Sequence, residues 1–312
     1  RELTTAEWLA IAEEARKAGM VFLLLTGGEP LLRPDFPELL HALKNMGFLV
    51  SVNSNGSLLR GELLEAVKRD PPLRFNITLY GGSNAAYERL CGRAMFREVV
   101  DNLRALKDAG IPVRLNVSVT PDNKDDVPEI FRLARELGLH TKASTYMYPP
   151  VRLGDGRPGD APHRFAPEDA ARYMLLCREQ QFTLEELRAS AAGVPLSDGD
   201  ECTGNAEGEP VLCRAGRSSF WLTWDGRMIP CGMMASPGTP VMEQGFSAAW
   251  RSVQTEVEAI RLPAACAGCA LRRHCNLCAA SCFAETGDYD RKPDYICSLT
   301  HTLCRITREK YG

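Results

Sequence analysis

Residues 21–30 read VFLLLTGGEP, an apolar run that ends in a glycine pair, a glutamate and a proline. A short apolar run bounded by glycine and proline is typical of a β-strand. Gly27 and Gly28 let a ligand approach the backbone closely because glycine has no side chain. Glu29 places a carboxylate beside them, which suits a charged amine. We therefore expect a strand at Val21–Thr26 with a ligand site at its C-terminal end.

Helical and strand-like patterns alternate through the first half of the chain. Thr4 and Glu7 form a capping-box pattern, which predicts an opening helix. Strands are predicted at Val21–Thr26, Phe48–Asn53, Phe75–Tyr80, Val113–Val119 and His140–Tyr146. Helices are predicted around Pro37–Met46, Leu58–Lys68, Phe96–Ala109 and Val127–Leu137. This order is that of an α/β protein with parallel strands.

The opening helix has no strand before it, although a crossover helix normally connects two strands. The sequence also begins at Arg1 instead of a methionine, so we expect that a first strand is missing. The predicted fold is a partial (β/α)6 TIM-like barrel followed by a small cysteine-rich domain, with the active site at the C-terminal ends of the strands. The predicted domains are the barrel at 1–150, a linker with one helix (about Pro167–Ala191) at 151–210, and the cysteine-rich domain at 211–312.

The composition is that of an ordinary globular protein, with 45% hydrophobic and 25% charged residues. A net charge of −3 provides no basic field for nucleic acid or acidic membranes. The longest apolar run near the start, Met20–Leu25, is too short to span a bilayer. We expect a cytoplasmic protein without nucleic-acid or membrane partners, whose many thiols need a reducing environment.

Nine of the twelve cysteines lie in the last hundred residues. Cys-x2-Cys pairs bring thiolates to one metal site without strain, and distant cysteines complete it. The array consists of Cys213, Cys231, Cys266, Cys269, Cys275, Cys278, Cys282 and Cys297, with Cys304 about two turns later. A disulfide framework does not suit a chain of this length without a secretory signal. Iron-sulfur clusters and structural zinc both stay open, because spacing does not select the metal.

Together these features resemble the radical S-adenosylmethionine enzymes with a C-terminal SPASM domain, over nearly the whole chain. The resemblance rests on Gly27-Gly28-Glu29-Pro30, Ser54-Asn55-Gly56, Ile77-Thr78-Leu79-Tyr80-Gly81 with Tyr87-Glu88-Arg89, and the cysteine array. It implies that Gly27, Gly28, Glu29 and Pro30 contact the amino group of S-adenosylmethionine. It further implies that Thr78 and Arg89 hold the methionine carboxylate, with Asn55 and Asn116 as weaker candidates. Taken alone, Thr78 is equally a plain strand residue and Arg89 a solvated helix charge.

One family motif is absent. The Cys-x3-Cys-x2-Cys sequence that holds the catalytic [4Fe-4S] cluster should precede Gly27, but the first cysteine is Cys91, which we interpret as structural. Either the motif lies on a missing N-terminal segment or the protein has lost it, and the unpaired first helix favours the missing segment. As written, the chain is expected to generate no radical, and no catalytic residue is assigned.

The resemblance also implies two auxiliary [4Fe-4S] clusters in the tail. It assigns Cys213, Cys231 and a later cysteine to the first, and Cys266, Cys269, Cys275 and Cys297 to the second. The family usually has three residues between its fifth and sixth cysteines, whereas here two precede Cys278 and Cys282 follows four residues later. We predict Cys278 as the sixth ligand, with Cys282 as its rival or as a fourth ligand to the first cluster. Cys202 and Cys304 are interpreted as ordinary thiols, and Cys177 as a packing residue on a helix.

The function implied is cleavage of S-adenosylmethionine to a 5'-deoxyadenosyl radical and modification of a peptide or protein, such as crosslinking during ribosomal peptide maturation. The implied partners are that substrate and a reductant such as flavodoxin or ferredoxin. Formylglycine formation, as in anaerobic sulfatase maturases, is a runner-up. Those enzymes have an aspartate after the second SPASM cysteine, where this chain has Gly232. A non-catalytic, zinc-stapled peptide-binding protein and a redox carrier are the alternatives from other classes.

Overall fold

The computed structural model describes residues 1–151, 156–196, 213–234 and 236–312. The chain divides into two compact units, Arg1–Ser144 and Thr145–Gly312. Among the described residues, none of the helices combines the length and the apolar character that a membrane crossing needs.

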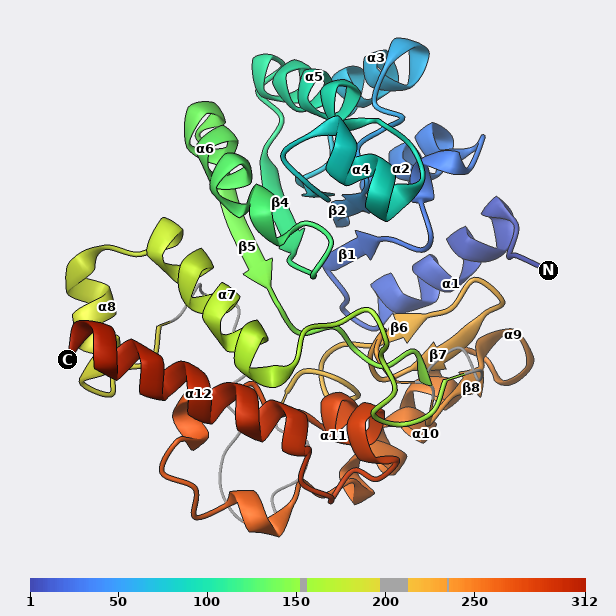
Figure 1. Ribbon diagram of the computed structural model, residues 1–312. Coiled ribbons are helices and arrows are strands. Elements are labelled where there is room, and N and C mark those ends of the chain that lie inside the picture. Colours follow the sequence, from blue (N-terminus) through green and yellow to red (C-terminus); the bar gives the residue numbers. More distant parts are fainter. Residues whose placement is uncertain (152–155, 197–212, 235) are drawn as a thin grey trace. The chain divides into compact units, whose positions relative to one another are not determined.

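Unit 1 contains a five-stranded sheet in which every neighbouring pair is parallel and the strand order follows the sequence (Figure 1). The strands are β1 (Phe22–Leu25), β2 (Leu49–Ser54), β3 (Arg74–Thr78), β4 (Val113–Ser118) and β5 (His140–Ser144). All five predicted strands are thus confirmed, and the fold is the expected α/β fold of parallel strands with alternating helices. β1 and β5 form the two edges of this sheet. The sixth strand stays a prediction.

The helices of unit 1 are α1 (Thr5–Lys17), α2 (Phe36–Asn45), α3 (Gly61–Arg69), α4 (Asn84–Cys91), α5 (Phe96–Asp108) and α6 (Val127–Leu137). Two short 3-10 helices, η1 (Pro30–Leu32) and η2 (Lys124–Asp126), follow strands β1 and β4. The capping box of Thr4 and Glu7 opens α1 as predicted. The sequence analysis missed α4, which is short and is defined by Ser83 as its N-cap and Gly92 in the left-handed conformation at its end.

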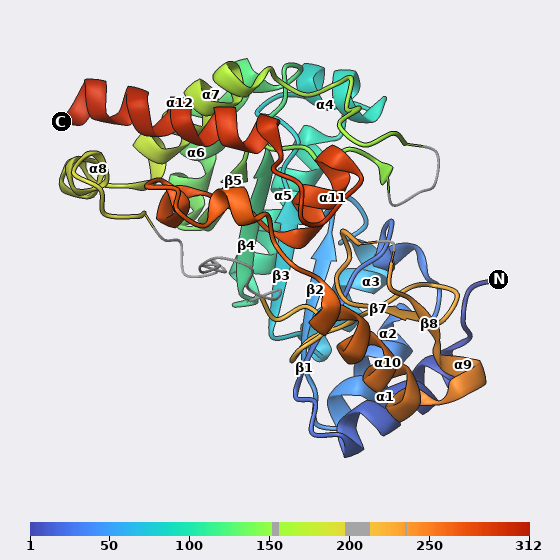
Figure 2. The same cartoon turned by 90° about the horizontal axis from the view of Figure 1, so that it is seen from below.

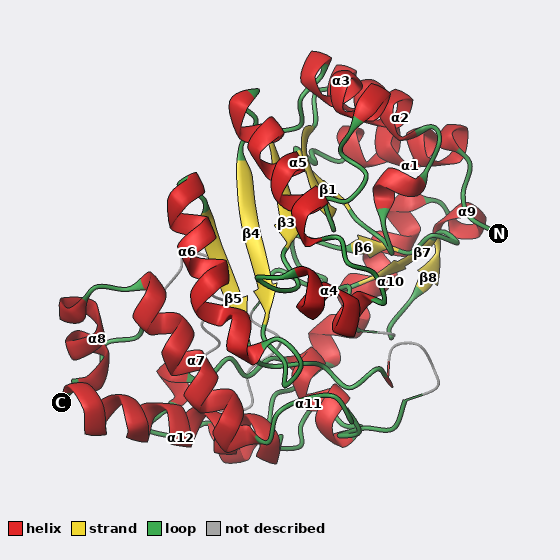
Figure 3. Ribbon diagram, turned by 45° about the horizontal axis from the view of Figure 1, so that its top comes forward, coloured by secondary structure: helices red, strands yellow, loops and turns green. Residues whose placement is uncertain are grey.

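Alternation along the strands gives the sheet two chemically different faces. Val52, Phe75, Ile77 and Leu115 on one face are completely buried, and helices such as α5 and α6 lie along the sheet (Figure 3). Residues in between point to the other face because successive strand side chains alternate. They are mostly polar: Ser51, Asn53, Asn76, Thr78, Arg114 and Asn116. The helices therefore cover the apolar face, and the opposite face presents polar groups.

Unit 2 combines a helical layer with a region of short elements. Its helices are α7 (Pro167–Gln181), α8 (Leu184–Ala191), α9 (Val241–Gln244), α10 (Phe246–Ala259), α11 (Ala279–Thr286) and α12 (Asp294–Tyr311). Its strands β6 (Trp221–Leu222), β7 (Arg227–Ile229) and β8 (Thr239–Pro240) form an antiparallel sheet, and η4 (Ala264–Cys266) and η5 (Arg272–His274) are 3-10 helices. α12 packs along α7 in both views (Figures 1 and 2) through Ala171, Leu175 and Leu303.

The segment predicted as a linker contains two helices where one was expected. Thr183 takes an extended conformation between α7 and α8, and its side chain accepts a hydrogen bond from the Glu186 amide in a capping box. This cap ends one helix and begins the next. Residues 152–155 and 197–210 of the predicted linker lie outside the described residues.

A buried ion pair ties the start of unit 2 to its C-terminal helices. Arg164 donates two hydrogen bonds to Glu285 of α11, at 2.6 and 3.0 Å, and the side chains are only 10% and 5% exposed. The Tyr146 hydroxyl donates to the same carboxylate at 2.7 Å. The Arg164 guanidinium also lies 3.8 Å from the ring centre of Tyr295 in α12. The residues after β5 are therefore built into the core of unit 2.

Candidate functional site

Glu29 joins the C-terminal ends of the first two strands in unit 1. Its Oε1 accepts hydrogen bonds from the Leu31 amide at 3.1 Å and the Ser54 hydroxyl at 2.9 Å, and its Oε2 accepts one from the Asn55 amide at 2.7 Å. A carboxylate that accepts several such bonds is held in one orientation. Glu29 thus fixes the turn after β2, a contribution that the sequence did not indicate.

The backbone before Glu29 is accessible. Gly27 has a φ of +151°, and a Cβ built on either Gly27 or Gly28 would meet no described atom within 4 Å. A side chain at position 27 would be strained in this conformation. Peptide groups at this strand end are therefore free of side-chain cover, as the predicted approach of a ligand requires.

Thr78 and Asn116, two further predicted ligand contacts, lie side by side. Thr78 ends β3, and its Cα is paired in register with that of Asn116 in β4. Asn55 follows β2, and its side chain accepts a hydrogen bond from the Ser57 amide at 2.9 Å. The three residues thus stand at the C-terminal ends of neighbouring strands, where the sequence analysis placed them.

Arg89 lies elsewhere. It is an exposed residue of α4 whose Nε and Nη2 donate to the Asp122 carbonyl at 3.2 and 3.0 Å. The structure therefore places its guanidinium on the loop after β4, and its role toward a carboxylate stays a prediction.

Asn123 is a site residue that the sequence analysis missed. Its side-chain amide donates to the carbonyls of Tyr80 at 2.8 Å and Ser118 at 2.9 Å, and it is 1% exposed. It thereby joins the ends of β3 and β4 as Glu29 joins those of β1 and β2. The only sequence signal is the turn-forming stretch Pro121-Asp122-Asn123.

The polar face of the sheet contains a pair of asparagines, Asn53 and Asn76, that the sequence analysis also missed. Asn76 donates its amide to the Asn53 side-chain oxygen at 2.8 Å across β3 and β2. Its own Oδ1 is buried and has no hydrogen-bond partner among the described residues. A buried acceptor of this kind suits a ligand that donates a hydrogen bond. The signal was the recurrence of asparagine inside otherwise apolar strands.

In unit 2, four of the predicted metal ligands line one pocket. They are Cys266, Cys269, Cys275 and Cys297, and we call this space the four-cysteine pocket. Leu271, Leu277, Pro293 and Ile296 line it as well, so the thiols share an apolar surround. Among the described residues, no three His, Cys, Asp or Glu side chains meet closely enough to bind a single ion.

Burial and hydrogen bonding act in opposite directions on these thiols. Burial raises the pKa of Cys275, while hydrogen bonds from the Thr300 side chain and the Leu277 backbone favour its thiolate. Burial also raises the pKa of Cys266, and the nearby thiols of Cys275, Cys297 and Cys269 raise it further. A bound metal centre would offset this effect, because a cation stabilises the thiolates.

Three other predicted ligands gather around Tyr148, and we call them the Tyr148 group. The Tyr148 hydroxyl lies 3.7 Å from Sγ of Cys278. Burial raises the pKa of Tyr148, and the negative charges of Cys278, Cys231 and Cys213 raise it further. Backbone amides donate to two of the sulfurs, Met233 to Cys231 and Ser281 to Cys278, both at 3.4 Å. Amide donors of this kind are typical of thiolates that bind iron.

The two rivals for the sixth ligand occupy one helix. Cys278 is the N-cap of α11 and belongs to the Tyr148 group, whereas Cys282 is fully buried one turn later. Burial raises the pKa of Cys282, and Cys278, Cys266 and Cys275 also contribute, so Cys282 lies near both cysteine sites. The choice between them stays a prediction.

The remaining cysteines have these positions. Cys177 is fully buried on α7, where burial raises its pKa to about 12, as suits a packing residue. Cys91 ends α4, and Cys304 lies on α12. Cys202 lies outside the described residues.

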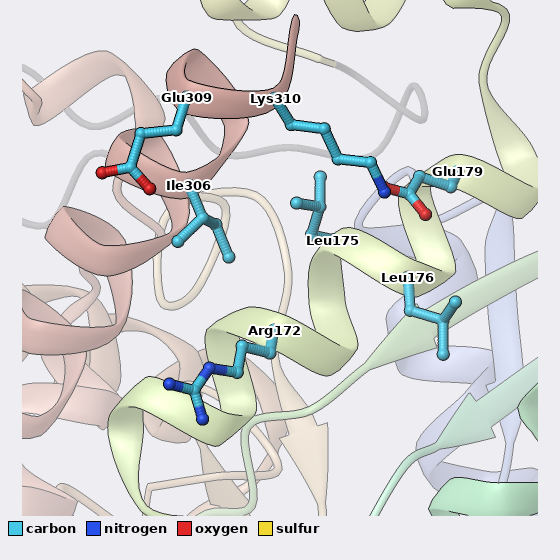
Figure 4. A pocket seen from close by; sticks show the side chains of 7 residues that line it. All are labelled: Arg172, Leu175, Leu176, Glu179, Ile306, Glu309 and Lys310. Carbon is cyan, nitrogen blue, oxygen red and sulfur yellow. The ribbon is translucent and has the colours of Figure 1, made fainter.

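A groove between α7 and α12 encloses about 450 Å³. Leu175 and Ile306 are among its lining residues, and Lys310 donates to Glu179 at 2.7 Å at its side (Figure 4). It contains none of the predicted site residues.

The residues present suit the groups that the sequence pattern implies. Four thiols around a common apolar pocket match a cluster in which each thiolate binds a different iron. The exposed peptide groups at Gly27 and Gly28 after β1, together with Thr78 on β3 and Asn116 on β4 of the same parallel sheet, suit a small polar cofactor.

Comparison with known proteins agrees with this geometry. The model of the radical SAM superfamily matches residues 1–134. The AdoMet-dependent heme synthase of Methanosarcina barkeri is 25% identical over 94% of this chain and 87% of its own length. Among solved structures, Streptococcus suis SuiB bound to its precursor peptide SuiA has a TM-score of 0.69 at 16% identity, covering 95% of this chain and 69% of SuiB. anSMEcpe with bound AdoMet and the Cp18Cys peptide has a TM-score of 0.70 at 14% identity, covering 97% and 88%. Over residues 1–134 the chain is therefore similar to the radical SAM superfamily.

Proposed function

We propose that this chain is the cofactor-binding and auxiliary-cluster part of a radical SAM enzyme that modifies a peptide or protein. The observation that supports it most is the pairing of two sites within one chain. Unit 1 has an open Gly27-Gly28 backbone at a strand end, and unit 2 has four thiols around one pocket. A zinc-stapled binding protein or a redox carrier would leave the first of these sites unexplained.

In unit 1 the residues bind and orient S-adenosylmethionine. Peptide groups at Gly27 and Gly28 contact its amino group, Thr78 and Asn116 offer hydrogen bonds beside it, and Glu29 holds the neighbouring turn in place. When bound together with a catalytic cluster, this cofactor supplies a 5'-deoxyadenosyl radical that removes a hydrogen atom from the substrate. The given sequence has no cysteine before Cys91, so the proposal includes a segment with the Cys-x3-Cys-x2-Cys motif for that cluster.

In unit 2 the cysteines hold two auxiliary [4Fe-4S] clusters. Cys266, Cys269, Cys275 and Cys297 bind the one in the four-cysteine pocket, and Cys213, Cys231 and Cys278 bind the one at Tyr148. An apolar surround and amide donors to sulfur are features of iron-sulfur sites, and both occur around these cysteines. A flavodoxin or ferredoxin is the expected reductant.

The peptide substrate is supported by the solved relatives, which include SuiB with a precursor peptide and anSMEcpe with a bound peptide. Formylglycine formation is less well supported. A Cβ at Gly232 would lie 2.8 Å from the Trp221 ring, so the site has no room for the aspartate expected of those maturases. Peptide crosslinking is therefore the preferred reaction.

Haem formation is a second candidate, favoured by a different observation. The heme synthase relative matches 94% of this chain and most of its own length, whereas the peptide-bound relatives share only the fold at 14–16% identity. That name suggests a tetrapyrrole substrate. The two candidates differ in substrate class and are separated by one assay.

The test uses a protein in which this chain follows a segment with the Cys-x3-Cys-x2-Cys motif, purified without oxygen. It is incubated with S-adenosylmethionine, dithionite and either short peptides encoded beside the gene or a porphyrin carboxylate. Mass spectrometry measures 5'-deoxyadenosine and the substrate masses. We expect 5'-deoxyadenosine together with a peptide that has lost a pair of hydrogen atoms.

The matched variants are Thr78→Val at the site and Thr302→Val on helix α12 of unit 2. Thr78→Val should lower the yield of 5'-deoxyadenosine by about tenfold, the loss expected for one charge-assisted hydrogen bond, and Thr302→Val should leave it unchanged. Turnover with the porphyrin alone would support haem formation instead. Zinc in place of iron in the purified chain would refute the enzyme proposal.

A further inference from the structure

Arg272 is a basic residue inside the cysteine array, on η5 between Cys269 and Cys275. It lines the four-cysteine pocket. Its Nη1 donates to the Cys275 carbonyl at 3.1 Å, which fixes the guanidinium beside a predicted ligand. Its Nη2 is buried and has no hydrogen-bond partner among the described residues. The Arg272 guanidinium is therefore held through Nη1, while its Nη2 points to a position that contains no described acceptor.

A buried charged donor without an acceptor is costly, and native structures rarely contain one without a reason. The pocket is lined by four thiols, apolar side chains, Thr300, His301 and Lys292, and within the described residues none of these groups accepts a hydrogen bond from Nη2. Lys292 is not a candidate acceptor, because it is a cation and pairs with Asp294 at 3.1 Å. The missing acceptor of Arg272 is therefore a sulfur atom of whatever occupies the pocket.

We propose that Nη2 of Arg272 donates a hydrogen bond to the iron-sulfur cluster held by Cys266, Cys269, Cys275 and Cys297, and that it raises the reduction potential of this cluster. The proposal rests on the cluster assignment above. Arg272 acts as a positioning and tuning residue, because it donates to sulfur and does not bind iron.

The direction follows from charge. A cluster with four thiolates is more negative after it gains an electron, so a fixed cation and a hydrogen bond stabilise the reduced form more than the oxidised form. The reduction potential of this cluster therefore rises. In the Tyr148 group the neighbouring side chain is a tyrosine, whose hydroxyl lies 3.7 Å from Sγ of Cys278.

The experiment is a redox titration of the full 312-residue chain, loaded with iron and sulfide without oxygen and followed by electron paramagnetic resonance. Arg272→Gln removes the charge and keeps a polar side chain, and Arg272→Lys keeps the charge and removes the planar fork. Arg273→Gln is the matched control, since Arg273 is an exposed neighbour that does not line the pocket. A Cys297→Ser variant identifies which reduction step belongs to this cluster.

We expect Arg272→Gln to shift one of the two steps to a more negative potential, by about 59 mV for a tenfold change in the one-electron equilibrium. Arg272→Lys should give a smaller shift of the same step, and Arg273→Gln none. If the glutamine variant fails to hold iron, the lysine variant decides. Unchanged potentials in an iron-loaded Arg272 variant would overturn the inference and leave the clusters in place. A wild-type chain that binds no iron would refute the cluster assignment itself.

Discussion

The two units of this chain are stabilised in different ways. Unit 1 has strands of four to six residues and helices whose apolar faces pack on them, so hydrophobic burial accounts for its fold. Unit 2 has strands of only two or three residues, and Cys266, Cys269 and Cys275 lie in or beside short 3-10 helices and turns. Short elements contribute few backbone hydrogen bonds and little apolar contact. The comparison suggests that unit 1 folds by itself, whereas the cysteine region of unit 2 depends on bound metal.

Removing the metal gives the largest expected difference between the units. Structural metal sites contribute about 10–16 kcal/mol in small zinc domains, and comparable thiolate sites should matter as much here. After iron is removed with a chelator, residues 266–297 should lose protection from hydrogen exchange, measured by mass spectrometry. The strands β2 to β4 should stay protected. Equal protection of both regions without metal would contradict the comparison.

The buried pair of Arg164 and Glu285 supplies the second difference. Arg164→Met leaves the Glu285 carboxylate buried without its partner, which we expect to lower the free energy of unfolding of unit 2 by about 3–5 kcal/mol. Urea unfolding followed by near-ultraviolet circular dichroism measures it. Arg305→Met is the control, because its pair with Glu309 is 59% exposed on both sides and should contribute less than about 1 kcal/mol.

A double variant, Arg164→Met with Glu285→Met, sharpens this test. Replacing both charges by apolar groups should recover much of the lost stability, since no unpaired charge stays buried. If the double variant is as unstable as the single one, packing against Tyr295 matters more than the ion pair.

The strands and helices of unit 1 were largely predictable from the sequence. Strands such as Val113–Ser118 alternate apolar and polar residues, and glycines such as Gly138 end the helices, so local patterns were sufficient. The pairing of Glu29 with Ser54 was not predictable. It joins residues 25 positions apart and depends on the side-by-side placement of β1 and β2.

In unit 2, the sequence predicted less of the site. The family resemblance grouped Cys266, Cys269, Cys275 and Cys297, and these four cysteines line one pocket. It gave no sign of Tyr148, which lies far from the array in sequence, or of the direction in which the Arg272 side chain points. Contacts made by tertiary packing have no periodic signature, so these residues required the structure.

Glu29→Gln tests whether the Glu29 carboxylate stabilises unit 1. The amide can present only one oxygen as acceptor where the carboxylate presents two, so at least one of the bonds from Leu31, Ser54 and Asn55 is lost. We expect a loss of about 1–3 kcal/mol in the free energy of unfolding of unit 1. Thermal unfolding measures it, with Glu62→Gln on α3 as an exposed control within about 0.5 kcal/mol of the wild type. Equal values for the two variants would show that Glu29 does not hold the turn.

The smallest effect concerns the cap between α7 and α8. Thr183→Ala removes the side-chain oxygen that accepts from the Glu186 amide at 3.2 Å, which should cost about 1 kcal/mol because N-cap oxygens satisfy an otherwise unpaired donor. The control is Ser298→Ala, which lies within helix α12. Thr5 is not used because its hydroxyl bonds to Asp35. If unit 2 depends mainly on its metal, the loss from Thr183→Ala should appear in helix protection near residues 184–191 and leave the cysteine region unchanged. Loss of iron from this variant would show that the helical layer and the cysteine region fold as one unit.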